Sequence, residues 1–593
     1  MPTQTFDLAD GLQQLPERQL FQMYERWVGG MPPARAAEII SNLIHQMSNP
    51  FAIAEARSRI YGDMIPIFDH LLFVHKLQTD AQIKAAVAQW EISDEARDAC
   101  LEALCVSGLV YVTAIDQQQQ WAVPTLIAER ISQVQSRPIL TSSPLAMWGW
   151  LNHHLSTKMP REALNGVIEN MHEMLVSSGN ITSRLQGLES RFLDVVQEVV
   201  ADFGGIISIA EFKQRFKEIK ISELCAALEK SSLGTVLDLD LEGFGLRHNE
   251  STLVILDEVV SELLQQPLAD ENITSLCKVS VGTDFVSNYS RFCSFLQQEK
   301  IKFTNAGRIF KTSGKRMAED LLLNNDFEFS KFELLENEFA FGLKNRFILG
   351  SGQKNFILSE KGERFLEYPL IEKMRLMLDW LIEDCSLNGD MSHQIRMRRS
   401  AIQFLTRLQP GTWYDVMCLP FVVRNYYFGL LNGGQIMPLH NQAFPVRSSS
   451  NSQELSWDLL LWMRKGLHML GIIDMAYDDN RRLVAMRLTS VGSELLGLLD
   501  LQQKSRVGHI VVNPDFEIVL FPDLASHHLI CSLDNFCDRE RTDSLLHFRL
   551  SQASVKRGVG QGLSYDSILS TLEKNSPTPI PQNVRYELKA WTK

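Results

Sequence analysis

Long apolar runs and paired cysteines are both missing from this sequence. No apolar stretch approaches the ~18 residues that a membrane-spanning helix needs, and the N-terminus has no basic segment followed by an apolar core. The nine cysteines are scattered singly and form no Cys-x-x-Cys pair, which argues against a zinc finger or a disulfide framework. We therefore expect a cytoplasmic protein with reduced thiols and no membrane contact.

Complete catalytic motifs are missing as well. A phosphate loop requires Gly-x-x-x-x-Gly-Lys-[Ser/Thr], but the nearest approach, around Gly314-Lys315, has Ile309 at the first glycine and Arg316 at the hydroxyl position. The segment Leu253–Glu258 imitates the magnesium-binding strand of such ATPases, yet without a phosphate loop it is better explained as a hairpin strand entering a helix. The run Gly558–Gly562 departs from the dinucleotide fingerprint, because Leu follows where a third glycine should stand. The sequence predicts no catalytic residue and no cofactor.

Two pairs of adjacent histidines are the nearest approach to a metal site. They are His153-His154 and His527-His528. Neighbouring residues on a helix point in different directions and rarely share a metal ion. We therefore predict surface or loop histidines at both places, and no metal site.

What is present is an ordinary globular composition with an acidic balance. Hydrophobic residues make up 45% and charged residues 22%, and 593 residues predict four or five domains. The net charge of −13 argues against a general nucleic-acid coat, because non-specific DNA affinity comes mainly from neutralised phosphates. Either DNA contact is local, through a basic strip on one module, or the acidic surface faces a basic protein partner.

A recurring unit organises the middle of the chain. It consists of helices, a β-hairpin with a polar tip, and a helix opened by Leu-[Ser/Thr]-x-x-Gly-x-x-apolar-Leu. The clearest copies span 347–366 and 471–496, and looser hairpins are expected at 109–123, with Asp116 and four glutamines at its tip, and at 236–256. The Ser or Thr should cap the helix, and the glycine should allow close packing against the hairpin.

Helices followed by a two-stranded hairpin correspond to the winged-helix plan. The predicted fold class is mainly α with small β-hairpins: tandem winged-helix modules followed by a C-terminal α+β domain. The predicted divisions are an N-terminal helical segment (1–50), winged-helix-like modules (51–135, 186–265, 266–370 and 371–500), a helical linker (136–185) and the C-terminal domain (501–593). The stretch from Asn425 to Ser450 is expected to be a loop insertion in the fourth module.

The C-terminal domain has the densest local signals. A hairpin is expected at 508–520 and a strand at 545–550; Ser551 should cap a helix that the glycines at 558, 560 and 562 end. Ser564 should cap the next helix, with Asp566 in its first turn, where the positive end of the helix dipole favours a carboxylate. Pro581 should open the last helix.

This ordered string resembles the N-terminal domain of XPB-type DNA helicases. The residues that carry the resemblance are Pro514, Phe516, Phe548, Arg549, Leu550, Ser551, Ser554, Val555, Gly562, Leu563, Ile568, Leu572, Ser576 and Pro581. In those helicases the domain precedes the motor, whereas here it ends the sequence. Together with the serial modules, the string resembles a prokaryotic helicase-associated family that carries this domain without a motor.

Four groups of basic residues are candidates for DNA contact. The first is expected at a helix start and the second at a hairpin tip. The third has near-helical spacing, and the fourth lies just before the glycine run; the alternative for each is a solvated face. The residues are Arg396, Arg398 and Arg399; Arg481 and Arg482; Lys311, Lys315 and Arg316; and Lys556 with Arg557.

The resemblance implies a non-catalytic adaptor or scaffold in DNA repair or transcription-linked remodelling. Its expected partner is an XPB-type helicase or another DNA-remodelling protein that supplies the motor, and possibly DNA. Two other functions remain open: a winged-helix transcription regulator, and a component of an anti-phage defence system. The sequence does not specify an oligomeric state.

Overall fold

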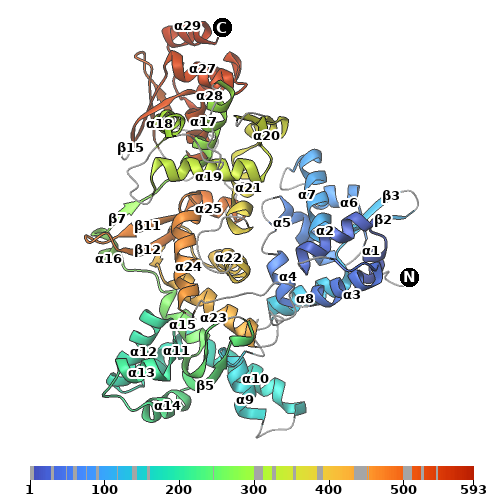
Figure 1. The fold of residues 1–593 in the computed structure, drawn as a ribbon, viewed down its shortest axis with the longest axis vertical. Helices are drawn as coiled ribbons and strands as arrows, with labels where there is room; N and C mark the ends of the chain where they lie inside the picture. The colour runs from blue at the N-terminus through green and yellow to red at the C-terminus, as the bar shows by residue number, and fades with distance from the viewer. Residues whose placement is uncertain are drawn as a thin grey trace. The chain divides into compact units, whose positions relative to one another are not determined.

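The computed structural model describes most of the chain as helices with small antiparallel sheets (Figure 1). The residues outside the description are 1–5, 29–31, 49, 58–59, 61–62, 75–76, 88–91, 116–117, 137–142, 157–160, 245, 299–310, 323–328, 352–354, 384–390, 433–450, 452, 499–509, 522–525, 543–544 and 593. The predicted fold class, mainly α with small β-hairpins, is confirmed; the winged-helix assignments stay predictions. No helix in the described part combines the length and the apolarity that crossing a bilayer requires.

The chain forms two compact units. Unit 1 comprises Met1–Pro267, Asn388–Leu408 and Tyr414–Leu460; unit 2 comprises Leu268–Leu387, Gln409–Trp413 and Leu461–Lys593. The range 371–500, predicted as one module, therefore contributes to both units. The sevenfold division of the chain stays a prediction.

Unit 1 begins with a helical body around one hydrophobic core, which draws on residues from Leu8 to Ile131. The elements of this body are α1 (Leu8–Gln13), α2 (Glu17–Trp27), α3 (Ala36–Met47), α4 (Pro50–Arg57), α5 (Met64–Val74), β1 (Gln78–Thr79), α6 (Asp80–Ala86), α7 (Asp94–Ser107), β2 (Tyr111–Ile115), β3 (Gln118–Ala122) and α8 (Thr125–Ser136). The predicted hairpin is present, but Gln118–Gln120 lie in strand β3 and not at the tip; Asp116 and Gln117 lie outside the described residues. β1 pairs with the other side of β3.

The rest of unit 1 surrounds a second small sheet, in the order β4-β6-β5. Its elements are α9 (Met147–Ser156), α10 (Arg161–Val176), α11 (Ser178–Gln186), α12 (Ser190–Phe203), β4 (Ile206–Ser208), α13 (Ile209–Arg215), α14 (Ile221–Lys230), β5 (Gly234–Asp240), a 3₁₀ turn (Glu242–Phe244), β6 (Asn249–Ile255), α15 (Asp257–Leu264), α22 (Met391–Leu405), α23 (Cys418–Asn432) and α24 (Glu454–Trp462), the last reaching into unit 2. β6 runs directly into α15, as predicted for Leu253–Glu258.

A buried arginine on α23 caps the C-terminal end of α12. The Arg424 guanidinium is fully buried and donates to the Phe203 carbonyl at 2.7 Å, and Asn425 Nδ2 donates to the Gly204 carbonyl at 2.8 Å. Carbonyls at a helix C-terminus lack partners within the helix and carry negative partial charge, so a cation there is favourable. The predicted loop insertion from Asn425 is thus wrong at its start, because Asn425–Asn432 are helical; residues 433–450 lie outside the described part.

Unit 2 contains the two clearest repeat copies and the C-terminal domain. Its elements are α16 (Asp270–Thr274), β7 (Cys277–Val279), α17 (Asp284–Gln298), α18 (Lys311–Asp320), α19 (Lys331–Lys344), β8 (Ile348–Ser351), β9 (Asn355–Leu358), α20 (Glu360–Glu367), α21 (Leu370–Glu383), β10 (Trp413–Asp415, at the division between the units), a π-helical turn (Met463–Leu467), β11 (Ile473–Tyr477), β12 (Leu483–Leu488), α25 (Ser490–Leu495), β13 (Ile510–Val512), β14 (Glu517–Leu520), α26 (Ser526–Phe536), β15 (Asp538–Thr542), β16 (Leu546–Arg549), α27 (Gln552–Gly560), α28 (Tyr565–Asn575) and α29 (Gln582–Trp591).

The repeat motif works as predicted in both copies. Ser359 and Thr489 are the N-caps of α20 and α25. Each side chain accepts a hydrogen bond from the backbone amide of the third residue of its helix. A side chain at Gly492 would place its Cβ 2.3 Å from the Ile472 carbonyl oxygen, and the same approach occurs between Gly362 and the Phe347 carbonyl oxygen at 2.5 Å. Glycine is therefore required where each helix meets its hairpin.

Glu338 is a buried acid in the packing of α19 against α17. Both carboxyl oxygens lack a hydrogen-bond partner within the described part of the chain, and burial raises the pKa of Glu338 well above its usual value. The folded protein thus keeps this carboxyl protonated at pH values where the unfolded chain ionises it.

We expect Glu338→Gln to remove a pH-dependent loss of stability. Because the folded pKa is raised, the wild type loses stability as pH rises above about 4.5, by up to about 1.4 kcal/mol per pH unit until the folded group ionises. Thermal unfolding of both proteins between pH 4 and 8 should show Glu338→Gln gaining over the wild type as pH rises. Glu336→Gln, an exposed change on the same helix, should show no such trend. A constant difference across the pH range would contradict this account.

Candidate functional site in the C-terminal lobe

Residues 510–593 fold as one lobe, which we call the C-terminal lobe (Figure 1). Its antiparallel sheet has the order β13-β14-β16-β15, with Ile518 opposite Phe548 and Leu520 opposite Leu546. Ile518 and Leu520 are buried and alternate with more exposed neighbours, as expected for a strand with one face on a core. Helices α26 to α29 supply the rest of that core.

The predicted caps of α27 and α28 are confirmed. Ser551 and Ser564 each cap a helix through reciprocal bonds with the serine three residues on, and Asp566 lies in the first turn of α28. Gly562, at φ +91°, follows the end of α27 in a conformation that favours glycine. Pro581 is the N-cap of α29, one residue before its predicted place.

The motif residues of the lobe are mostly structural. Phe548, Leu550, Ser554, Val555, Ile568 and Leu572 are buried. Leu563 and Tyr565 pack partly against the same core. Ser576 Oγ donates to the Thr578 carbonyl at 2.8 Å in the turn before α29. The sequence pattern thus describes how the lobe folds.

The turn between β13 and β14 is fastened to the last helix. Phe516 has φ +70°, its amide donates to the Asn513 carbonyl, and its ring lies 5.3 Å from the Trp591 ring. Asn583 Nδ2 donates to the Pro514 carbonyl at 2.6 Å. Pro514 and Phe516 therefore hold the chain's final helix against the opening hairpin.

A buried ionic network joins the lobe to helix α17. The Arg539 guanidinium lies between two carboxylates, with NH1 2.6 Å from Asp284 Oδ1 on α17 and Nε 2.7 Å from Asp534 Oδ1 on α26. All three side chains are at most 9% exposed. Burial opposes the charge of Arg539, but Asp534 and Asp284 outweigh it and raise the pKa of Arg539, so the cation is fixed.

Further hydrogen bonds from α17 reach the same lobe. Ser287 Oγ donates to Asp534 Oδ2 at 2.7 Å, and Arg291 NH2 donates to the Asp534 carbonyl at 3.3 Å. Gln561, just after α27, donates to Ser294 Oγ at 2.8 Å. One face of α17 thus carries a row of polar groups that all have partners on the lobe. Sequence reasoning missed this row, because isolated Asp, Ser and Arg residues carry no motif.

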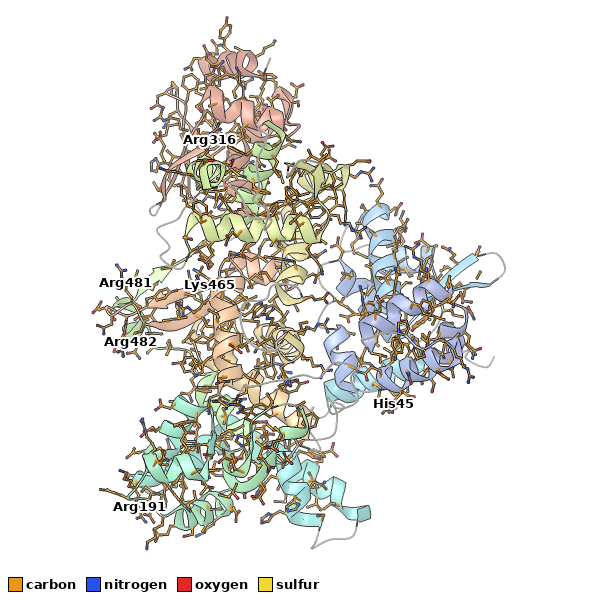
Figure 2. The ribbon with its side chains drawn as sticks, viewed as in Figure 1. His45, Arg191, Arg316, Lys465, Arg481 and Arg482 are labelled. Atoms are coloured by element: carbon orange, nitrogen blue, oxygen red, sulfur yellow. The ribbon has the colours of Figure 1, made fainter. Side chains whose placement is uncertain are left out.

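Among the predicted DNA contacts, Arg481 and Arg482 lie exposed at the tip of the β11–β12 hairpin, where Figure 2 labels them. The turn is fixed by Asp478, whose carboxylate accepts from the Arg482 amide at 2.8 Å. β7 pairs with β11 and places the exposed Lys278 on the neighbouring strand, opposite Ala476. The tip therefore presents cations on a support of paired strands, in the order β12-β11-β7.

The other three predicted groups differ in the exposure of their basic side chains. Arg396, Arg398 and Arg399 lie inside α22, which begins at Met391, and Arg398 is buried; their placement at a helix start and the exposure of Arg398 were wrong. Lys315 and Arg316 are exposed on α18, whereas the side chain of Lys311 lies outside the described part. In the last group Lys556 is exposed.

Two arginines of the lobe, one from the DNA-contact prediction and one from the motif, have structural partners. Arg557 NH2 donates to the Cys537 carbonyl at 2.7 Å and to Asp538 at 3.0 Å. Arg549 pairs with Glu540 across the edge of the sheet and donates to the Asp515 carbonyl at 3.1 Å. Both side chains thus tie together parts of the lobe.

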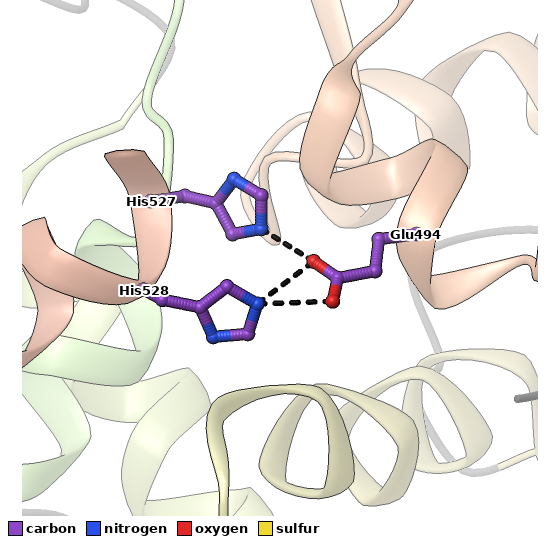
Figure 3. Close-up of side chains that lie close together, drawn as sticks. All are labelled: Glu494, His527 and His528. Carbon is purple, nitrogen blue, oxygen red and sulfur yellow. Dashed lines mark hydrogen bonds and ion pairs between the residues drawn. The ribbon is translucent and has the colours of Figure 1, made fainter. Parts of the chain in front are cut away.

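The histidine pair His527-His528 is a correction to the sequence analysis. Both rings face Glu494 of α25, with His527 Nε2 2.6 Å and His528 Nε2 2.9 Å from Glu494 Oε2 (Figure 3). His527 is buried, so the predicted surface or loop position is wrong for this residue, and so is the expectation that the two rings point apart. His153 is exposed on α9, as predicted, and His154 stacks on Trp150. Glu494 was missed, although it lies in the repeat motif.

The two histidines affect the ionisation of Glu494. Burial raises the pKa of Glu494, but the hydrogen bonds from His527 and His528 outweigh it and bring the pKa to about 2. Glu494 is therefore ionised throughout the physiological range.

A cavity of about 960 Å³ lies in the N-terminal body of unit 1. Asp80, Asp98 and Glu102 lie on its wall beside Leu101 and Val106. None of the residues predicted to bind DNA lines this cavity.

Comparison with known families gives a match to the C-terminal lobe. Residues 510–593 match the family model described as helicase conserved C-terminal domain. The match begins at β13 and ends after α29, so it coincides with the lobe. A search of curated proteins finds no match to this chain. The lobe is thus similar to a conserved domain of helicases, and its finer resemblance to the N-terminal domain of XPB-type helicases stays a prediction.

We expect Arg539→Ala to loosen the C-terminal lobe from α17. Removing one partner of a buried ion pair costs about 3–5 kcal/mol, because Asp284 and Asp534 would be left buried without their cation. Limited proteolysis and hydrogen exchange of α17 and α26 should report the change. The control is Arg549→Ala, whose partly exposed pair with Glu540 should contribute little to stability. Equal effects of the two substitutions would contradict the assigned role.

Proposed function

We propose that this protein is a non-catalytic helicase-associated adaptor that acts with DNA and a separate XPB-type helicase in DNA repair or transcription-linked remodelling. The observation that carries the proposal is the helicase-related lobe at residues 510–593, whose fold accounts for the motif residues of the resemblance. The XPB-type partner and the repair or transcription setting rest on that resemblance.

Two features of the chain argue against nucleotide hydrolysis and so support a non-catalytic role. The sequence has no complete phosphate loop. The segment that imitates a magnesium-binding strand ends in Asp257-Glu258. Both carboxyl oxygens of Asp257 are buried, and burial raises the pKa of this carboxyl well above its usual value. Because these buried oxygens leave no open side for a hydrated magnesium ion, Asp257 does not suit nucleotide hydrolysis.

Direct DNA contact is proposed at the β11–β12 hairpin tip. Arg481, Arg482 and Lys278 are exposed on this support, and cations on a projecting hairpin can reach phosphates or a minor groove. The net charge of −13 makes such a local patch the favoured route to DNA, because the rest of the surface is acidic on average.

A second candidate is a winged-helix transcription regulator. It is favoured by the order α12-β4-α13-α14-β5-β6. The three helices precede a hairpin of β5 and β6, and β4 pairs with β6 to give a three-stranded sheet. A regulator would bind one DNA sequence tightly at physiological salt, whereas the adaptor would bind DNA with little sequence preference. Selection from a random duplex library separates the two functions.

The adaptor proposal predicts no ATP turnover by the purified chain. With Mg²⁺ and DNA present, hydrolysis should stay at background, and adding a co-encoded XPB-type helicase should give turnover that this chain increases. Activity that co-elutes with the chain on gel filtration, in the absence of any helicase, would refute the proposal.

Arg481→Ala combined with Arg482→Ala should weaken DNA binding in a salt-dependent way. Each lost phosphate contact lowers the slope of log affinity against log salt by about 0.9, so the double variant should lose about 2 from the slope. The matched control removes two partly exposed arginines that pair with glutamates, Arg364→Ala with Arg585→Ala. Similar losses in both double variants would indicate a net-charge effect and remove the hairpin tip from the proposal.

A further inference from the structure

The cluster of Glu494, His527 and His528 has the side-chain chemistry of a metal site. One ligand atom from each residue lies within 4.8 Å of the other two. Two imidazole nitrogens and one carboxylate oxygen form a ligand set that zinc uses in proteins, with the fourth position left to water. The two rings converge on the same carboxylate from adjacent positions on α26 (Figure 3).

The distances leave room for an ion after a small adjustment. In a tetrahedral zinc site with bonds of about 2.0–2.2 Å, the ligand atoms lie about 3.3 Å apart. His528 Nε2 is 2.9 and 3.0 Å from the two Glu494 oxygens, and His527 Nε2 is 2.6 Å from Glu494 Oε2, so the carboxylate needs to move back by up to about 0.7 Å. The Glu494 side chain ends in flexible torsions that permit this movement.

One of the three side chains is accessible to solvent, so a metal ion can reach the cluster. The Glu494 and His527 side chains are 8% exposed, whereas the His528 side chain is 39% exposed. An ion can therefore reach the cluster from the His528 side, while the two buried ligands hold it in a partly desolvated position. Neutral imidazole and ionised carboxylate are the forms that bind zinc.

We propose that Glu494, His527 and His528 bind a single zinc ion that ties α25 to α26. Glu494 lies at the end of the second repeat motif, and both histidines lie in the first turn of a C-terminal lobe helix. The ion thus links α25, which follows the β11–β12 hairpin, to α26 of the C-terminal lobe within unit 2. This role is independent of the proposed function, since it concerns only how the lobe is held.

The test is metal binding by the full-length, tag-free protein. After removal of metal with a chelator, titration with Zn²⁺ should give one bound ion per chain, and Co²⁺ in its place should give the visible absorption of a tetrahedral site. Glu494→Gln and His528→Ala should each weaken zinc binding by at least about tenfold to a hundredfold, because losing even an outer-shell partner costs that much. Near-UV circular dichroism checks that each variant is folded.

His45→Ala is the control, since His45 is exposed on α3 in unit 1 and is labelled in Figure 2. It should bind zinc like the wild type. Glu494→Gln keeps an acceptor for both imidazoles, so it retains the hydrogen bonds and loses only the anionic ligand. Zinc binding that is absent from the wild type, or unchanged in folded Glu494→Gln and His528→Ala, would overturn the proposal.

Discussion

The position of Arg539 between Asp284 and Asp534 is the constraint on which the arrangement of unit 2 depends. A buried cation without its carboxylates would cost several kcal/mol, so helix α17 and the C-terminal lobe must keep this geometry or expose the charges to water. Ser287 and Arg291 extend the same contact to the carboxylate and carbonyl of Asp534. Such networks are sensitive to displacement, because hydrogen bonds to charges depend strongly on distance and direction.

Unit 1 also contains a buried arginine that binds a helix from a distant part of the chain. Arg424, fully buried on α23, ends helix α12 by binding its last carbonyls, and burial lowers the pKa of Arg424 to about 9. In both units a single arginine therefore holds a helix from a distant part of the chain. Arginine suits this task because its planar group donates several hydrogen bonds in fixed directions and remains charged when partly desolvated.

These contacts support the proposal that the protein positions other components. The helicase-related lobe is held by its own core and by α17, and its motif residues are used in folding. The exposed Arg481 and Arg482 lie instead on a hairpin whose turn is stabilised by Asp478. In the proposed function these two arginines are the DNA-binding group, and the hairpin holds them in place.

The sequence alone determined the elements that depend on near neighbours. The caps Ser359, Thr489, Ser551 and Ser564, the hairpins and the glycine at 492 were predictable, because each uses groups within a few residues or a regular spacing. Only the tertiary structure decided which isolated residues meet. Asp284 and Arg539 are 255 positions apart, and Glu494 lies 33 positions before His527. No local pattern records such contacts, since they arise from the packing of whole elements, and the same packing buried Arg398 and turned two adjacent histidines toward one carboxylate.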